Sequence, residues 1–464
     1  MMAMLTRLAK RAAFHATVAI GGFQRRAGGR FPRYASFCRR AAGYVAYAMA
    51  GEPFRAVTAS PPSGAPAVQV PGTALGRASH LEVAGAHVIC IEEPVGPINA
   101  GFFHLRGWLT SERTLPDIRS VVNGKPFPLC RYARPDVQGD YPDRQTTGFS
   151  VFVRLGEIPN PEYVTIEILA GADRLIQQIE DATAAAVEAG QRGEEARREK
   201  REWVLPRIAC LDCGGDLNRA AECCSCGRVY EAGGILDCIP PEVHGRWDVE
   251  FSGAVCSHGY DGDVERVIAK AEASGGKVLD CGAGLRPTIR RNVVTTEIFP
   301  YPTTDVLAVN HRLPFKDSVF DAVLSLHVLE HVADPFACAK ELCRVLKPGG
   351  TLFAVTPMIV PEHGYPHHFF NPTREGLARL FDRTSDAARV FVPAMGHPIN
   401  ALWAVLAFYR DSLPELHRDT FLQLTVRDIL ARSMEEWLMQ DVALALSEEG
   451  RARLAGNFCI EFVK

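Results

Sequence analysis

Short apolar runs separated by turn residues fill the chain between residues 80 and 178. Examples are "HVICIEE", "GFFHLRGWLT", "GFSVFVRL" and "YVTIEIL", which are rich in β-branched and aromatic residues. The stretch "VNGK", from Val122 to Lys125, places Asn-Gly between two such runs and predicts a hairpin turn. Several strands at this spacing are typical of a small antiparallel β-sandwich, which we expect over residues 76–178.

From Lys277 onwards the pattern changes to near-continuous apolar runs that alternate with helical stretches. A helix is predicted before the last of these runs, because Asp334 is a suitable N-cap, Pro335 suits the first turn and "LKPGG" ends the pattern. Apolar runs of this kind are typical of a parallel sheet that is covered on both faces. The predicted strands are residues 277–280, 292–297, 304–309, 320–328 and 350–357.

Polar and basic segments separate and precede these two regions. Residues 179–203 are charged and rich in helix formers, which predicts a solvated linker helix. Residues 59–72 are rich in Pro, Gly and Ser and are interpreted as a linker. Residues 1–51 hold nine Lys and Arg and no acidic residue. Within an N-terminal segment of residues 1–75, this pattern fits a transit peptide, a membrane-surface amphipathic helix or a poorly ordered basic tail.

Composition narrows the class of protein. The chain has 464 residues, 47% hydrophobic and 23% charged, with a formal net charge of −3. This length suggests several domains, and the near-neutral charge gives no strong signal for a nucleic-acid partner. No apolar run is long enough to span a membrane. We therefore expect a cytoplasmic protein, with peripheral membrane contact through the basic N-terminus as an alternative.

Four cysteines in residues 204–245 have the spacing of a metal site. Cys210 and Cys213 form one Cys-x-x-Cys pair, and Cys223 and Cys226 form a second. Two such turns place four thiolates around one ion and leave no open position, which predicts a structural zinc ribbon. Cys224 lies inside the second pair and is expected to point away. The alternatives are two accidental pairs or a redox pair, although a redox site needs only one such motif.

The stretch "KVLDCGAGLRP", Lys277 to Pro287, ends a predicted strand in a Gly-x-Gly turn. A dinucleotide site normally has a third glycine and a helix N-terminus that faces a pyrophosphate, and both are missing. A cofactor with a ribose and an adenine but no phosphate needs neither, which favours S-adenosylmethionine. Only Gly282 to Asn292 separate the first two strands, so the connecting helix is expected to have barely two turns.

The motifs "VLDCGAG", "LPFKDSVFDAVLSLHVLEHVADPF" and "ELCRVLKPGGTLFAVTP" occur in order within residues 276–382. This set resembles the class I S-adenosylmethionine-dependent methyltransferases with an LPF…FD…LEH core. The resemblance implies an α/β fold, a Rossmann-like seven-stranded methyltransferase domain over residues 250–464. Residues 388–395 and 456–464 would be its closing strands, and the apolar helices between them a core or homodimer face. The cysteine segment is similar to the zinc ribbons of methyltransferase activators, and the β-sandwich loosely resembles immunoglobulin-like accessory domains of glycan-modifying enzymes.

The resemblance also implies roles for particular residues. An acid ending the second strand, here Glu297, would bind the ribose hydroxyls. Family members often carry an acid near the adenine where this chain has Val309, with Asn310 beside it as a possible adenine contact. His327 would lie by the methionine end of the cofactor, and His331 is interpreted as a structural residue of the turn after it. The residues implied to hold the methionine moiety are Asp280, Gly282, Ala283 and Gly284.

Methyl transfer to a hydroxyl benefits from a general base, and the loop after the fifth strand contains histidines. His363 and His367 are the candidates, and a lid that only covers the site is the alternative. We expect a methyltransferase that acts on a hydroxyl or other acceptor, which the accessory domain suggests is a glycan or its precursor. A tRNA or protein methyltransferase that uses the zinc ribbon, and a non-catalytic scaffold, are the competing interpretations.

Overall fold

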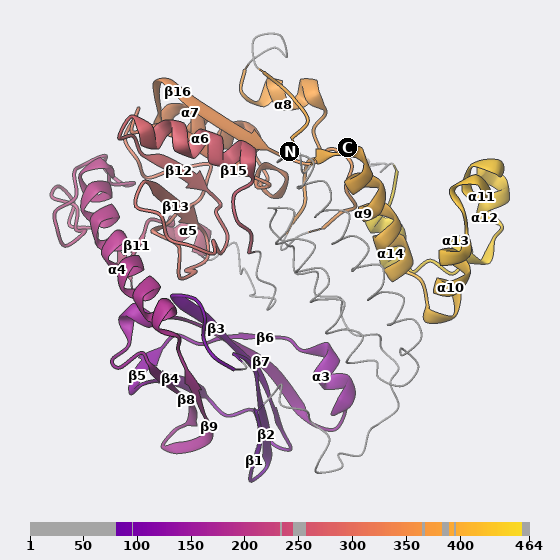
Figure 1. Cartoon of the computed structure of the whole chain (residues 1–464), viewed down its shortest axis with the longest axis horizontal. Coiled ribbons are helices and arrows are strands. Elements are labelled where there is room, and N and C mark those ends of the chain that lie inside the picture. The colour runs from indigo at the N-terminus through magenta and orange to yellow at the C-terminus, as the bar shows by residue number, and fades with distance from the viewer. Residues whose placement is uncertain are drawn as a thin grey trace, which may run out of the picture.

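The computed structural model describes residues 80–94, 96–232, 234–244, 257–363, 367–382, 389–393 and 396–456. The basic N-terminal segment and the linker at residues 59–72 lie outside these described residues. Figure 1 shows two main bodies, an antiparallel β unit (residues 80–181) and an α/β unit built around a parallel sheet, with the long helix α4 (Ala184–Val204) running between them.

The β unit consists of two antiparallel sheets that share one core. Inward-facing residues alternate along the strands, such as Leu105 and Leu109 from one sheet and Ile166 and Ile176 from the other. The predicted Asn-Gly hairpin is confirmed, because Asn123 and Gly124 both have positive φ between β4 and β5. The resemblance of this unit to immunoglobulin-like accessory domains stays a prediction. The first sheet has the order β1 (His80–Ala84), β2 (His87–Glu93), β3 (Phe102–Ser111), β7 (Gln145–Arg154) and β6 (Cys130–Tyr132). The second has the order β5 (Lys125–Phe127), β4 (Ile118–Val122), β8 (Tyr163–Ala170) and β9 (Asp173–Asp181), and the short helices are α3 (Pro135–Asp140) and η1 (Leu155–Glu157).

Helix α4 forms where the sequence predicts a linker helix, but it is not solvated on all sides. Its Lys200 is 1% exposed and donates to Asp305 Oδ2 at 2.6 Å and to the Val293 carbonyl at 3.0 Å. Near its start, Gly190 touches the β unit so closely that a Cβ there would lie 2.9 Å from the Gly156 nitrogen. The expectation of a solvated helix is therefore wrong for this face, which joins the two units.

The α/β unit contains strands at the five places that the sequence predicts. Their order is β16 (Leu346–Val355), β15 (Phe320–Leu326), β12 (Val278–Cys281), β13 (Val293–Glu297) and β14 (Val306–Leu307), all paired in parallel. Helix α6 (Gly262–Ala273) packs on the face that holds Val278 and Ala322, and α7 (Pro335–Val345) packs on the face that holds Leu279 and Val323. The predicted N-cap is confirmed, because Asp334 accepts from the Ala337 backbone N–H at 2.9 Å.

The cysteine segment (residues 208–238) extends this sheet beyond β14. Its β11 (Ile235–Asp237) pairs in parallel with β14, and β10 (Glu231–Ala232) pairs antiparallel with β11. Buried Cys210, Leu217 and Tyr230 join the hydrophobic cluster on the α7 side of the sheet. The cysteine segment is thus part of the α/β unit's core, followed by the short helix α5 (Pro241–His244) and preceded by η2 (Leu205–Arg207).

The connection from β12 to β13 contains no helix, which corrects the expectation of a short one. Residues 282–292 form turns and bends. Arg286 is turned inward onto Asp280, and Pro287 cannot donate a backbone hydrogen bond to a helix. Helix α4 lies along this connection instead, because Gly193 packs against Ile289, and Glu195 and Glu199 pair with Arg291.

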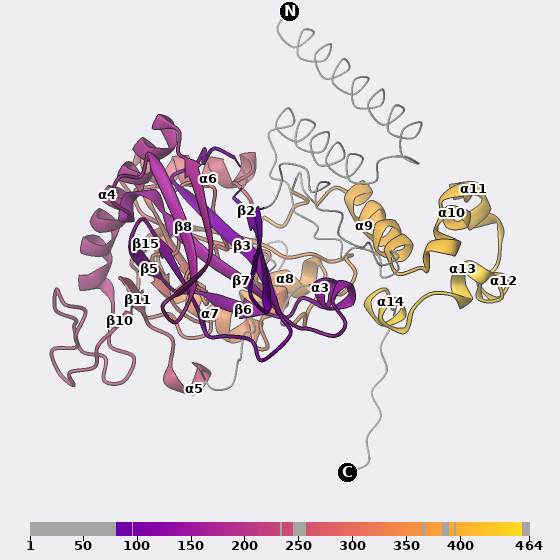
Figure 2. The ribbon, with the colours of Figure 1, turned by 90° about the horizontal axis from the view of Figure 1, so that it is seen from below.

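The C-terminal part also differs from the expectation. Residues 389–393, the described part of the first predicted closing strand, form no strand, and residues 457–464 of the second lie outside the described residues. Helices α9 (Pro398–Asp411), α10 (Glu415–Gln423) and α11 (Val426–Ala431) bury no residue, and Trp403 and Leu430 are exposed, so they are not core. Figures 1 and 2 show α9–α13 set apart from the parallel sheet, and a homodimer face there stays a prediction. The remaining helices are η3 (Leu329–His331), α8 (Arg374–Leu380), α12 (Met434–Leu438), α13 (Asp441–Leu444) and α14 (Glu448–Arg453).

None of the helices in the described residues combines the length and the apolar character that crossing a lipid bilayer requires.

Candidate cofactor and metal sites

The Gly-x-Gly turn lies at the carboxyl ends of the parallel strands, where such sheets bind ligands. Gly282 and Gly284 have φ of +68° and +61°, which favours glycine. A Cβ on Gly282 would lie 2.7 Å from the Val328 side chain, so the turn also needs glycine for close packing. The backbone N–H groups of Gly282 and Ala283 donate to the Thr296 carbonyl at 2.9 and 3.0 Å, which holds the turn against the end of β13.

Glu297 meets this turn directly. One carboxylate oxygen accepts from the Gly284 N–H at 2.8 Å and the other from its own neighbour Ile298 at 2.8 Å. Burial raises the pKa of Glu297 above its ordinary value, and these two hydrogen bonds oppose the shift. The structure therefore brings the acid that ends β13 to the glycine turn, and its predicted contact with a ribose stays a prediction.

Asp280 lies in β12, directly before the turn, and its carboxylate is held by internal hydrogen bonds. Its carboxylate is 0% exposed and accepts from Arg286 Nε at 2.8 Å, Arg286 Nη2 at 3.1 Å and the Tyr260 hydroxyl at 2.7 Å. Arg286 is itself 1% exposed and stacks over the Tyr260 ring. The described contacts of Asp280 are thus internal, and its predicted contact with a cofactor stays a prediction.

Val309 has a structural reason to replace the acid seen in relatives of the predicted family. Its side chain is buried with Leu307 against Ile235 of the cysteine segment and Ile239, which directly follows Cys238. A carboxylate there would be buried among apolar groups without a partner, which is costly. Asn310 follows in a half-buried turn and is the polar side chain nearest in sequence to that edge.

A cluster of histidines and one glutamate lies at the carboxyl ends of β15 and β16. His327 directly follows β15, has φ of +58° and is 49% exposed in its side chain. Glu330 is 0% exposed and lies in η3, and the loop after β16 brings His363 to it and to His331. The rings of His331 and His363 are 5.3 Å apart between centroids.

The two histidines predicted as general bases are not equivalent. His363 lies in the cluster, whereas the described contact of His367 with the cluster is made by its backbone carbonyl, which accepts from His331 Nδ1 at 2.7 Å. The His367 ring lies beside Phe369 instead. His331, which the sequence suggested was a structural turn residue, is half-buried and central to the cluster.

The four predicted zinc ligands do come together. The Sγ atoms of Cys210 and Cys226 are 3.5 Å apart, as are those of Cys213 and Cys223, and all four lie within 4.8 Å of one another. Zinc–sulfur bonds of about 2.3 Å in a tetrahedron place sulfurs about 3.8 Å apart, so the donor set fits zinc. Cys224 is exposed and outside this group, as expected.

Neighbouring groups favour the thiolate form of Cys210. Burial raises the pKa of Cys210, but hydrogen bonds from the Tyr230 hydroxyl and from backbone N–H groups outweigh it and bring the pKa to about 6. Gly214 and Gly227, which follow the two cysteine pairs, have φ of +73° and +75°, so the chain turns back around the sulfurs there.

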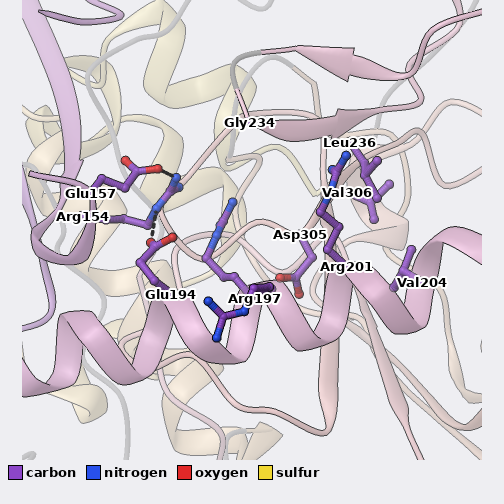
Figure 3. A pocket seen from close by; sticks show the side chains of 11 residues that line it. Arg154, Glu157, Glu194, Arg197, Arg201, Val204, Gly234, Leu236, Asp305 and Val306 are labelled. Carbon is purple, nitrogen blue, oxygen red and sulfur yellow. Dashed lines mark ion pairs between the residues drawn. The ribbon is translucent and has the colours of Figure 1, made fainter. Parts of the chain in front are cut away.

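A cavity of about 180 Å³ lies elsewhere, at the joint between the units (Figure 3). Its charges are compensated only in part: Arg154 pairs with Glu157 and Glu194, whereas Arg197 donates to two backbone carbonyls. None of the predicted cofactor residues lines it. It is lined by Arg154, Glu157, Glu194, Arg197, Arg198, Arg201, Val204, Gly234, Leu236, Asp305 and Val306.

The parallel sheet and its glycine turn thus form a Rossmann-like fold. Comparison with known proteins indicates the class of protein. Residues 282–354 match the family described as "Methyltransferase domain". The chain is 37% identical over 99 residues to the ubiquinone/menaquinone biosynthesis C-methyltransferase of Chromobacterium violaceum, covering 21% of this chain and 39% of that protein. It is 33% identical over 114 residues to the ubiquinone biosynthesis O-methyltransferase of Xanthomonas campestris pv. campestris, covering 20% of this chain and 48% of the relative.

The chain thus spans less than half the length of these relatives. Among solved structures it is similar to the [4+2]-cyclase SpnF, with 20% identity over 26% of this chain and 55% of that one, but the TM-score is only 0.21. The prediction of a methyltransferase domain is confirmed by the family match, which runs from the glycine turn to the end of β16.

Sequence reasoning missed Arg286 and Tyr260, which neutralise and orient Asp280. Arg286 carried a signal, since an arginine six residues after a buried acid, in a connection too short for a helix, has little else to pair with. Tyr260 and His331 carried no such sequence signal, because their roles depend on contacts between distant segments.

Proposed function

We propose that this protein is an S-adenosylmethionine-dependent methyltransferase. The observation that carries the proposal is the match of residues 282–354 to methyltransferase domains, which begins at the turn where Gly284 donates to the Glu297 carboxylate. S-adenosylmethionine supplies an electrophilic methyl group when it is bound. The residues that would hold it are Gly282, Ala283 and Gly284 in the turn and Glu297 at the ribose, with Asn310 and His327 at the two flanks.

The chain's own residues would act mainly by positioning. Methyl transfer needs a nucleophile aligned behind the methyl group and water kept away from it. The Asp280–Arg286 ion pair fixes the turn, and Val328 packs against Gly282 so that the turn cannot move towards β15. His363, on the loop that covers the end of β16, is the side chain best placed to take a proton from an acceptor.

We further propose that Cys210, Cys213, Cys223 and Cys226 hold a structural zinc ion. Four thiolate donors leave no open position, so the metal would stabilise the segment that extends the parallel sheet and would not take part in transfer. Removal of the ion would therefore disturb the edge at Val309 through Ile235 and Ile239.

For the acceptor we propose a hydroxyl group. A cluster of imidazoles at the carboxyl edge supports it, because a hydroxyl must lose its proton during transfer and histidine exchanges protons near neutral pH. A glycan or glycan precursor as the molecule that carries this hydroxyl stays a prediction of the sequence. The relatives act on other molecules, since two of them are named for ubiquinone biosynthesis.

The test is transfer of a radiolabelled methyl group from S-adenosylmethionine to a fractionated extract of the source cell, with the Glu297→Ala variant as the negative control. We expect label in one fraction with wild type only. Label that survives alkali and is released as methyl iodide by hydriodic acid indicates an ether from a hydroxyl. Label released by mild alkali indicates a methyl ester, and alkali-stable label that hydriodic acid does not release indicates an N- or C-methyl group; either result refutes the hydroxyl acceptor. Absence of transfer together with absence of cofactor binding would favour the non-catalytic scaffold.

A further inference from the structure

The cluster at the carboxyl ends of β15 and β16 contains a buried carboxylate that its surroundings do not satisfy. Glu330 is 0% exposed, and neither carboxylate oxygen has a hydrogen-bond partner among the described residues. The nearest cationic candidate is His327, whose Nδ1 is 3.6 Å from Oε1 and therefore too far for a hydrogen bond. Within the described part of the chain, Glu330 thus has an ion-pair contact with a half-exposed histidine but no hydrogen bond to its carboxylate, and burying a carboxylate in this way is costly unless a cation completes the site.

His331 and His363 flank this carboxylate in orientations that suit a cation. A ligand atom from each lies within 4.8 Å of the others and of a Glu330 oxygen. His331 Nδ1 lies 2.7 Å from the His367 carbonyl, and His363 Nδ1 lies 2.9 Å from the Pro361 carbonyl. Carbonyl oxygens only accept, so in both neutral rings Nδ1 carries the proton and Nε2 carries the lone pair.

This arrangement is the one that metal-binding histidines normally have. A ligating imidazole usually donates its second ring N–H to a carbonyl or carboxylate, which fixes the ring and its tautomer. The nearby His368 is different, because its Nδ1 accepts from the His363 backbone N–H at 3.1 Å and its Nε2 donates to Asn371 Oδ1 at 2.7 Å. Both of its nitrogens are in use, so it supports the loop and is not a ligand.

We propose that Glu330, His331 and His363 bind a divalent first-row transition metal ion. Two imidazoles and one carboxylate suit manganese, iron, cobalt or zinc and leave coordination positions open. Metal–ligand bonds of about 2.1 Å place neighbouring ligand atoms about 3.0–3.4 Å apart, so ligand atoms that lie within 4.8 Å of one another would close in by at most about 1.4–1.8 Å when the ion binds. Half-buried His331 and His363 provide the side from which the ion enters.

The position of this site indicates a role for the ion in methyl transfer, and this role rests on the proposed methyltransferase function. Val328, which packs on Gly282 of the cofactor turn, is two residues from Glu330, so the ion and the turn lie at the same sheet edge. The ion would bind the acceptor hydroxyl and lower its pKa, and this role replaces proton abstraction by His363, whose imidazole is then a metal ligand. In the transfer the acceptor oxygen–carbon bond forms, the sulfur–methyl bond of S-adenosylmethionine breaks, and the hydroxyl proton leaves to water.

The test is binding of Mn²⁺ to the full-length protein loaded with one equivalent of zinc, which the four thiolates take, measured by electron paramagnetic resonance and calorimetry. Manganese is chosen because imidazole and carboxylate groups bind it, whereas thiolate sites prefer zinc. We expect one saturable site per chain in the wild type, and binding at least tenfold weaker in Glu330→Gln and in His363→Gln. The matched controls are Glu362→Gln, which removes an exposed carboxylate from the same loop, and His417→Gln on α10, and both should bind Mn²⁺ like wild type.

Binding of S-adenosylhomocysteine to the same samples separates this inference from the proposed function. Variants that bind this ligand but not Mn²⁺ are folded and support the metal site. Wild type that binds S-adenosylhomocysteine but shows no saturable Mn²⁺ site, or equal Mn²⁺ binding by Glu330→Gln, overturns the metal site and leaves the methyltransferase proposal intact. Mn²⁺ binding without any binding of S-adenosylhomocysteine supports the metal site and contradicts the methyltransferase proposal. Loss of methyl transfer in His363→Gln without a metal site in wild type would indicate a proton relay instead.

Discussion

Arg286→Leu should strongly destabilise the α/β unit. Arg286 and Asp280 are 1% and 0% exposed, and the arginine supplies two of the three hydrogen bonds to the Asp280 carboxylate. Leucine removes both and leaves a buried negative charge with only the Tyr260 hydroxyl. Removing one partner of a buried ion pair typically costs about 3–5 kcal/mol.

The assay is urea unfolding with the other four tryptophans replaced by phenylalanine, so that the fluorescence reports on Trp203, whose ring lies 5.6 Å from that of Phe320 in the sheet core. Arg290→Leu is the matched control, since Arg290 also lies near the Tyr260 ring but forms a partly exposed pair with Glu265 that is worth about 1 kcal/mol or less. The double variant Asp280→Asn/Arg286→Leu should recover most of the lost stability. A cost below about 1 kcal/mol for Arg286→Leu, or one equal to that of Arg290→Leu, would show that the pair does not hold the turn.

Three further predictions concern the other parts of the molecule. Cys213→Ser should lose the bound zinc, detected as a fall from about one ion per chain by metal analysis, and full retention would refute the four-thiolate site. Burial, aided by the charge of Arg106, lowers the pKa of His104 to about 3. The unfolded chain therefore binds this proton more tightly, so stability of the β unit should fall by a few kcal/mol between pH 6.5 and 4. His104→Gln should flatten this pH dependence in urea unfolding followed by fluorescence, with Trp108 kept as the single tryptophan, and an unchanged dependence of stability on pH would contradict this prediction. Gly190→Leu should push α4 off the β unit at a cost of about 1–3 kcal/mol, seen as faster amide exchange in α4, and unchanged exchange would contradict the close approach.

The sequence predicted the parts of the fold that depend on local pattern. Continuous apolar runs identified the parallel strands, and Asp334 and Pro335 identified the start of α7. The sequence did not predict that α4 is buried, because Lys200 looks like a solvated residue until Asp305, distant in the chain, is placed beside it at 2.6 Å. The edge of the sheet was also missed, since β11 is a three-residue strand inside a segment whose cysteines dominate its pattern.

The candidate sites also differ in how far the sequence predicts them. The glycine turn and Glu297 end adjacent parallel strands, so the sequence alone indicates that they lie together. The four cysteines are paired by spacing, and the structure brings their sulfurs within one cluster. The group of Glu330, His331 and His363 depends on how a loop folds back after β16, where the backbone N–H of Phe369 donates to the Glu330 carbonyl at 2.6 Å, and no periodicity predicts such a contact.

The central claim is that the turn between Gly282 and Gly284, together with Glu297, holds S-adenosylmethionine. Calorimetric titration of the purified chain with S-adenosylhomocysteine tests it most directly, with Glu297→Ala as the site variant and Glu272→Ala, an exposed glutamate on α6, as the matched control. We predict one binding site per chain and an affinity at least about tenfold weaker in Glu297→Ala, because hydrogen bonds to a charged acceptor are worth about 1.5–3 kcal/mol each. The Glu272→Ala variant should bind like wild type. No binding by the wild-type protein, or equal binding by Glu297→Ala, would contradict the account.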